Sequence, residues 1–200
     1  MATAIAAKDV AALRARTGAG MMDCKNALTE TGGDVEKAIE LLRKKGMARA
    51  DKRAGRGATE GLIGSYVHFN GKVGVLVEVN CETDFVARTD DFQQLARDLA
   101  LHIASADPLA VRIEDLPAAV VTREKEIFRA LAAESGKPEK IWDKMVEGKL
   151  RKFYEERVLL EQPFVKDDKQ TVGEVVKAVS GKVGENIVVR RFTRYALGEA

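Results

Sequence analysis

The sequence has 200 residues, of which 46% are apolar and 32% are charged. Thirty-three basic residues nearly balance thirty-one acidic ones, and the resulting net charge of +2 is too small to predict nucleic-acid binding. Its apolar runs are shorter than the roughly 18–20 residues that a membrane-spanning helix needs, and its N-terminus resembles neither a signal peptide nor a transit peptide. With two cysteines far apart in the chain, we expect a reduced, cytoplasmic protein with no membrane association.

The first fifty residues contain three short helical patterns, which lie at residues 3–16, 21–30 and 34–46. Asp34 is a favourable N-cap for the third helix, and the basic residues in its last turn suit the negative end of the helix dipole. We expect this helix to end at Gly46. The pattern predicts a three-helix domain over residues 1–47, followed by a basic, glycine-containing linker over residues 48–60.

Residues 61–80 predict a β-hairpin. Side chains alternate on both sides of Asn70-Gly71, a dipeptide that strongly favours a turn between two strands. In the second strand four residues of one type recur at every other position and therefore share one face, namely Val73, Val75, Val77 and Val79.

Three amphipathic helical patterns follow, at residues 91–106, 117–134 and 139–160. The first places four apolar side chains on one face, namely Phe92, Leu95, Leu99 and Ile103. The sharp break at 135–138 predicts that the other two pack as an antiparallel helical hairpin over about 117–160. A last helix is expected from Thr171, which has capping-box spacing with Glu174, and a strand over 186–195 ends the pattern.

Enzymatic motifs are absent from the sequence. It contains no phosphate-binding glycine loop, no metalloprotease motif and no paired cysteines, and its only histidines are His68 and His102. We therefore expect no catalytic residue, metal site or cofactor.

Two segments place apolar residues in unusual positions. In the first, Phe85 follows Asp84 where the chain leaves the second strand. Phe85 either packs into the core beside a turn-forming Asp84, or protrudes as an aromatic anchor for a partner. In the second, Met21 and Met22 follow a glycine-rich turn. They either fill the core of a small helical domain or adapt to the surface of a partner.

Five collinear strings resemble the elongation factor Ts family across nearly the whole chain. They are RTGAGMMDCKNAL (16–28), VNCETDFVAR (79–88), SGKPEKIWDKMVEGKLRKF (135–153), QPFVKDDKQTVGEVV (162–176) and GENIVVRRFTRY (184–195). The resemblance implies an α+β protein with an N-terminal three-helix domain similar to ubiquitin-associated domains. It also implies a basic linker and an α+β core over 61–200, with an antiparallel sheet and a projecting helical hairpin.

The resemblance further implies a function and the residues that perform it. Members of the family are guanine-nucleotide exchange factors that release GDP from elongation factor Tu, and they do not catalyse a chemical reaction. Their intruding segment corresponds to Thr83, Asp84, Phe85 and Val86. Contacts from the N-terminal domain correspond to Arg14, Met21 and Met22, and a weaker one corresponds to His68.

One departure from the family predicts a dimer. Longer members carry a duplicated core module, whereas this chain has a single hairpin at 61–80. A half-sized sheet leaves one edge and one face uncovered, which a two-fold partner would complete. We therefore expect a homodimer that binds two molecules of elongation factor Tu.

Two other readings compete with this one. A helical adaptor would use only the first fifty residues to bind peptides or ubiquitin-like folds. An RNA-binding protein would use the basic linker together with Lys149, Arg151 and Lys152, although these charges also suit an ordinary solvated helix face. We expect no specific nucleic-acid partner.

Overall fold

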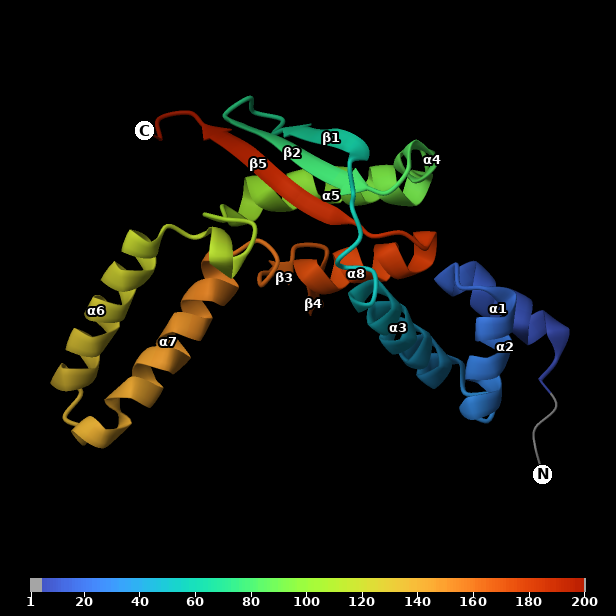
Figure 1. The fold of residues 1–200 in the computed structure, drawn as a ribbon, viewed down its shortest axis with the longest axis horizontal. Coiled ribbons are helices and arrows are strands. Elements are labelled where there is room, and N and C mark those ends of the chain that lie inside the picture. Colours follow the sequence, from blue (N-terminus) through green and yellow to red (C-terminus); the bar gives the residue numbers. More distant parts are fainter. Residues whose placement is uncertain (1–4, 200) are drawn as a thin grey trace.

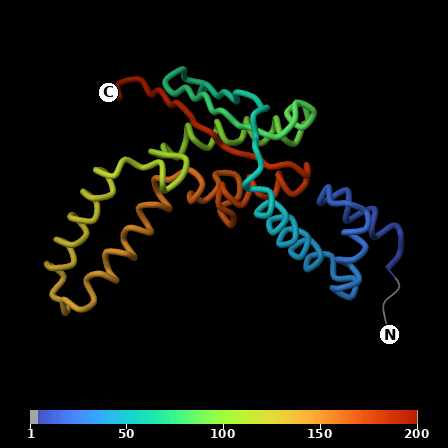
Figure 2. Tube along the Cα trace, viewed as in Figure 1, coloured from blue at the N-terminus to red at the C-terminus, as the bar shows by residue number. Residues whose placement is uncertain are grey.

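The structure is a computed structural model that describes residues 5–199, and its fold is α+β (Figure 1). Residues 1–4 and 200 lie outside the described residues. The start of the predicted helix 3–16, the start of the predicted unit 1–47 and the end of the predicted unit 61–200 therefore lie outside the described residues as well. The chain runs from the N-terminal helices through a central sheet to a helical hairpin at the opposite end of the molecule (Figure 2). None of the helices described is both long enough and apolar enough to cross a membrane.

Three helices form the N-terminal unit: α1 (Ala7–Thr17), α2 (Met21–Glu30) and α3 (Val35–Asp51). As predicted, the Asp34 carboxylate caps α3 by accepting a hydrogen bond from the Lys37 amide at 3.1 Å. The predicted end of this helix at Gly46 is wrong, because α3 continues to Asp51. A glycine inside a helix costs only about 1 kcal/mol, and the packing of α3 on the C-terminal helix of the chain offsets that loss.

The extension of α3 changes the description of the linker. Residues 48–51, expected to be linker, are helical, and only residues 52–59 separate α3 from the first strand. The division of the chain into two domains at this segment stays a prediction.

An antiparallel three-stranded sheet lies at the centre of the fold, with the strand order β1-β2-β5. Its strands are β1 (Glu60–Val67), β2 (Val73–Cys81) and β5 (Val188–Ala196), which confirms the predicted hairpin and the predicted final strand. The inner face carries the buried valines of β2, namely Val75, Val77 and Val79. Two helices supply most of the remaining core on this side, α5 (Asp90–Ala106) and α8 (Val172–Val183).

Both helices follow their sequence patterns. The four apolar residues predicted to share a face of α5 are all buried, namely Phe92, Leu95, Leu99 and Ile103. At the start of α8 the Thr171 hydroxyl accepts from the Glu174 amide at 3.2 Å, and the Glu174 carboxylate accepts from the Thr171 amide at 3.1 Å. This reciprocal pair confirms the predicted capping box.

The predicted helical hairpin consists of α6 (Ala118–Glu134) and α7 (Trp142–Arg157), which project from the core (Figure 1). Short 3-10 turns precede each helix, at Ile113–Asp115 and Glu139–Ile141. Helix α7 ends at Arg157 and not at residue 160, because the next residues turn into the core. There, Val158 and Leu159 are buried and the Leu159 amide donates to the Ala110 carbonyl at 2.9 Å.

A second, two-stranded sheet was not predicted. It pairs β3 (Pro163–Phe164) with β4 (Asp167–Thr171). One strand has two residues and the other is polar, so neither shows the alternation by which a strand is recognised in a sequence.

Candidate functional site

The chain leaves β2 through a single helical turn, α4 (Asp84–Ala87), which exposes an aromatic ring. The Thr83 hydroxyl caps this turn by accepting a hydrogen bond from the Val86 amide at 3.4 Å. Val86 is buried in the sheet core, whereas 77% of Phe85 is exposed. Of the two readings of Phe85, the core position is therefore wrong, and the ring protrudes.

An acidic side chain lies beside this ring. The Asp84 carboxylate accepts a hydrogen bond from the Arg88 guanidinium at 2.6 Å; the Arg88 side chain is largely exposed and the Asp84 side chain is about half exposed. Such an exposed ion pair contributes little to stability. Asp84 is not the cap of the turn, since Thr83 takes that position, and its carboxylate is available on the surface next to Phe85.

A distant carboxylate, Glu185, binds the loop between β2 and α4. One Glu185 oxygen accepts from the backbone amides of Glu82 and Thr83, each at 3.0 Å. The other accepts from the Thr83 hydroxyl at 2.6 Å. Sequence reasoning assigned no role to Glu185, and its position in the string 184–195 was the only signal that included it.

The same loop is bound from a second direction. The Glu82 carboxylate accepts from the Asn186 amide at 2.7 Å, and the Asn186 side chain donates to the Arg56 carbonyl at 2.8 Å. Cys81 is buried just before the loop, and burial together with the Glu185 charge raises the pKa of its thiol to about 11. Cys24 is also buried, and both cysteines are free thiols.

A second apolar pair is exposed at the start of α2. Met21 is 46% exposed and Met22 is 64% exposed, which excludes the reading that both fill the core of the N-terminal unit. Arg14 is exposed on the preceding helix. Figure 1 places this turn and α4 at the same end of the molecule, opposite the helical hairpin.

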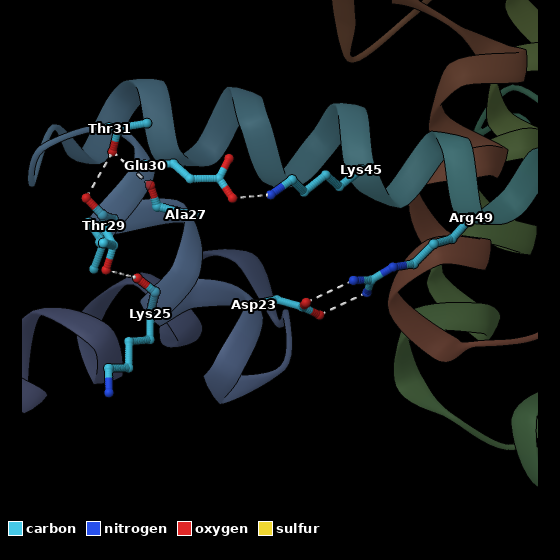
Figure 3. A network of polar contacts seen from close by, with 9 residues as sticks. Asp23, Lys25, Ala27, Thr29, Glu30, Thr31, Lys45 and Arg49 are labelled. Atoms are coloured by element: carbon cyan, nitrogen blue, oxygen red, sulfur yellow. Dashed lines mark hydrogen bonds and ion pairs between the residues drawn. The ribbon is translucent and has the colours of Figure 1, made fainter.

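Two ion pairs attach α2 to α3 (Figure 3). The Arg49 guanidinium donates to both oxygens of Asp23, at 2.8 and 2.7 Å, and the Lys45 ammonium contacts Glu30 at 2.6 Å. The hydrogen bond from Arg49 is the main cause that lowers the pKa of Asp23. The Asp23 pair holds the start of α2 against the long third helix, and the Glu30 pair holds its end.

His68 lies at the other end of the sheet from Phe85. It occupies the turn between β1 and β2, where its Nδ1 is 2.9 Å from the Tyr66 hydroxyl and its ring lies 4.4 Å from that of Phe69. The nine residues of β2 separate this turn from α4, which corresponds to roughly 26 Å at the usual rise per residue. The structure therefore does not bring His68 together with Phe85.

A cleft of about 460 Å³ lies between the α1–α2 turn, α3 and α8. Its lining includes six basic residues, namely Arg16, Arg43, Lys45, Arg49, Arg53 and Lys182. Four of them already contact acidic side chains, which limits the free positive charge. Across residues 5–199, no three His, Cys, Asp or Glu side chains are grouped closely enough to hold a metal ion.

Comparison with known proteins identifies relatives over the whole chain. A family model described as Elongation factor TS matches residues 2–199. The chain is 59% identical to "Elongation factor Ts" of Moorella thermoacetica, over 98% of this chain and 96% of the relative. It is 60% identical to the protein of that name from Geobacter metallireducens, over 98% and 90%. For the one from Coprothermobacter proteolyticus, the identity is 57% over 98% and 99%.

Proposed function

Because this chain belongs to the elongation factor Ts family, we propose that it is a guanine-nucleotide exchange factor for elongation factor Tu. The observation that supports this role most directly is the exposed Phe85 ring beside Asp84. The loop that carries the ring is held by hydrogen bonds to Glu185 and Asn186. An aromatic side chain of this kind is a typical energetic anchor in a protein interface.

The proposed mechanism is an intrusion that weakens GDP binding. A GTPase holds GDP through contacts to the phosphates and through a magnesium ion that neutralises their charge. An apolar ring does not compete for that charge, but it shifts the elements that position the metal and the phosphate-binding loop. Linkage then requires that GDP weaken the binding of the exchange factor by the same factor. The factor accelerates release and transforms no substrate, so it is not an enzyme.

The proposed residues divide into contact residues and supporting residues. Asp84 and Phe85 are the contact residues of the intruding turn. Thr83 caps that turn and Val86 anchors it in the core of this chain. We assign a second contact to Met21, Met22 and Arg14, which are exposed on the N-terminal unit.

His68 is proposed as a third and weaker contact. It lies at the far end of the sheet from the intruding turn, so a partner that meets both must extend along the length of β2. We further propose that the N-terminal helices form a domain similar to ubiquitin-associated domains, and that the protein acts in the cytoplasm.

The exchange function is tested by measuring the release of a fluorescent GDP from purified elongation factor Tu. We expect this chain to accelerate release strongly, with a rate that rises with its concentration and then saturates. If the folded chain leaves the release rate from a cognate Tu unchanged, the proposed function is wrong and the helical-adaptor reading gains support.

We also propose a homodimer formed through the outer face of the sheet. Four large side chains on this face are exposed, namely Ile63, Val67, Leu76 and Tyr195. Their register places them together, because Leu76 faces Ser65 and Thr193 while Gly74 faces Val67 and Tyr195. An exposed apolar patch of this kind is typical of an interface. The same face carries the Glu78–Arg191 ion pair. In a two-fold dimer each acidic residue of this pair can lie opposite a basic residue of the other copy.

Light scattering at micromolar concentration tests the dimer. We expect twice the mass of one chain, and we expect Leu76→Lys to give monomers because it places a charge in the apolar patch. Val165→Lys, which alters an exposed apolar residue outside this sheet, is the matched control. A monomeric wild-type chain rejects the proposal.

A further inference from the structure

The intruding turn cannot hold its own position. Helix α4 has only four residues, and a helix of that length is unstable by itself in water because nucleation is unfavourable. Within it, the Phe85 side chain is 77% exposed, and Val86 is the residue buried in the sheet core. Val86 anchors one side of the turn in the core, and the position of its first residues depends in addition on the contacts of the residues that precede it.

Glu185 provides the most concentrated of these contacts. Its carboxylate accepts three hydrogen bonds from Glu82 and Thr83, at 2.6 to 3.0 Å. Thr83 is also the N-cap of α4, so the same hydroxyl that donates to Glu185 accepts from the Val86 amide. A bond to Glu185 thus fixes the first residue of the turn, and through the cap it fixes the direction of α4.

The backbone at the end of α8 places the Glu185 carboxylate beside the loop. Helix α8 ends at Val183 and is capped by Gly184, whose φ of +83° is a left-handed conformation that glycine adopts without strain. The two residues that follow bind the loop in opposite senses. Glu185 accepts hydrogen bonds from the loop amides, and the Asn186 backbone amide donates to the Glu82 carboxylate. A reciprocal pair of this kind resists both translation and rotation of the loop.

The same end of α8 also supports the N-terminal unit. Gly181 packs directly on α3, so closely that a Cβ at Gly181 would lie 2.9 Å from the Gly46 carbonyl oxygen. The side chain of Lys182 passes against Gly18, at the end of α1, and reaches Asp91 of α5 with an N–O distance of 2.6 Å. One short segment, residues 181–186, therefore contacts both regions that carry proposed partner contacts.

We propose that Glu185 is the positioning residue of the intruding turn: it holds Phe85 in the orientation needed for nucleotide exchange, at a fixed place relative to the N-terminal unit. The inference rests on the proposed exchange function. It predicts that Glu185 acts through Phe85 and not through a contact of its own with the partner.

The experiment compares Glu185→Ala, Glu185→Gln and Glu185→Asp in the fluorescent-GDP release assay with full-length chains. We expect Glu185→Ala to lower the maximal stimulated rate about tenfold, as for a displaced reacting group, with a smaller change in the half-saturating concentration. Glu185→Gln keeps the side-chain length and an oxygen acceptor, so it should retain most of the rate. Glu185→Asp keeps the charge but shortens the reach, so it should be slow.

A double variant separates positioning from direct contact. If Glu185 acts through the ring, Phe85→Ala with Glu185→Ala should be no slower than Phe85→Ala alone, because coupled residues are not additive. Glu161→Ala is the control, since this exposed carboxylate has no hydrogen bond or ion pair among residues 5–199. Thermal unfolding is measured for every variant. If Glu185→Ala does not fold, the comparison of Glu185→Gln with Glu185→Asp still tests the positioning role.

The outcomes distinguish this inference from the function on which it rests. No stimulation by the wild-type chain would overturn the proposed function. A slow Phe85→Ala chain with a fast Glu185→Asp chain would overturn only the positioning role. Additive losses in the double variant would show that Glu185 acts independently of the ring, which also contradicts the inference.

Discussion

The N-terminal unit and the sheet core both expose large apolar side chains, but they support them differently. Met21 and Met22 begin α2 after Gly20, which offers no side-chain cap. The ion pair between Arg49 of α3 and Asp23 holds the start of this helix. Phe85 instead lies on a turn that is capped by Thr83 and bound by a carboxylate from the far end of the chain. The methionines are thus supported by a contact between neighbouring helices, whereas the direction of the Phe85 ring is fixed by a contact between distant segments of the chain.

The hydrophobic cores of the two regions also differ in size. The N-terminal core contains few large side chains, chiefly Leu13 and Leu28, with Val10, Cys24 and two alanines around them. The sheet core joins β1, β2 and β5 to α5 and α8 and includes Phe92, Leu99 and Ile103. Because the smaller core buries less apolar surface, we expect the N-terminal unit to open before the sheet does.

The largest expected effect is on stability. Leu99→Ala should lower the free energy of unfolding of the sheet core by about 3 kcal/mol, because it leaves a cavity under β2. Leu13→Ala, equally buried, should expose α1 and α2 to hydrogen exchange while protection of the sheet amides stays near wild type. Equal loss of protection in the β1–β2 hairpin would show that the two regions unfold as one unit.

The next effect concerns exchange activity. Phe85→Ala should lower the stimulated GDP release rate by roughly 30-fold or more, which corresponds to a loss of about 2 kcal/mol of interface energy. The melting temperature should stay unchanged because the ring is exposed. Met22→Ala should mainly raise the half-saturating concentration of this chain, by less than about tenfold. Val165→Ala, another exposed apolar truncation, is the control in the GDP release assay. Undiminished exchange by a folded Phe85→Ala chain would remove the distinction between the two regions.

A smaller effect should appear where the regions meet. Gly181→Ala places a methyl group 2.9 Å from the Gly46 carbonyl oxygen, so α3 must move away from α8. We expect a loss of about 1–2 kcal/mol from overpacking, measured by thermal unfolding. Gly148→Ala, in an exposed helix with open space around the glycine, should be neutral or stabilising. If the two variants behave alike, the two helices do not depend on this close contact.

The smallest effect is a pH dependence confined to the sheet core. His102 is buried and neutral, since its Nδ1 accepts from the Val165 amide at 3.2 Å and its Nε2 donates to Gln162 at 2.9 Å. Burial lowers the pKa of His102 below its usual 6.5. Below that pH the unfolded chain binds a proton that the folded chain does not, so stability should fall as the pH drops and stay level above it.

Urea unfolding at pH 7.5 and at pH 5.5 measures this dependence. We expect a decrease of at most about 1.4 kcal/mol for each pH unit below 6.5, and His102→Gln should flatten it. The N-terminal unit contains no histidine, so hydrogen exchange in α1 and α2 should not follow the same slope. A slope that is identical in His102→Gln would assign the effect to other groups.

Periodicity and local hydrogen bonding could be predicted from the amino-acid sequence. The alternating valines of β2, the apolar face of α5 and the capping box at Thr171 all act over a few residues. Each pattern is complete within one element, so the hairpin, the main helices and the final strand could be predicted. The two exposed segments were also found in this way, because an aromatic after a strand end and methionines after a glycine turn are local anomalies.

Which of these residues protrude, and which contacts hold them, depends on the packing of distant segments. Whether Phe85 is core or surface depends on the packing of α4, which buries Val86 and leaves Phe85 exposed. Whether α3 continues past Gly46 depends on its close packing against α8. The role of Glu185 depends on a contact across 102 residues of chain. Burial and long-range hydrogen bonds are properties of packed surfaces, and no local pattern in one sequence specifies which surfaces will meet.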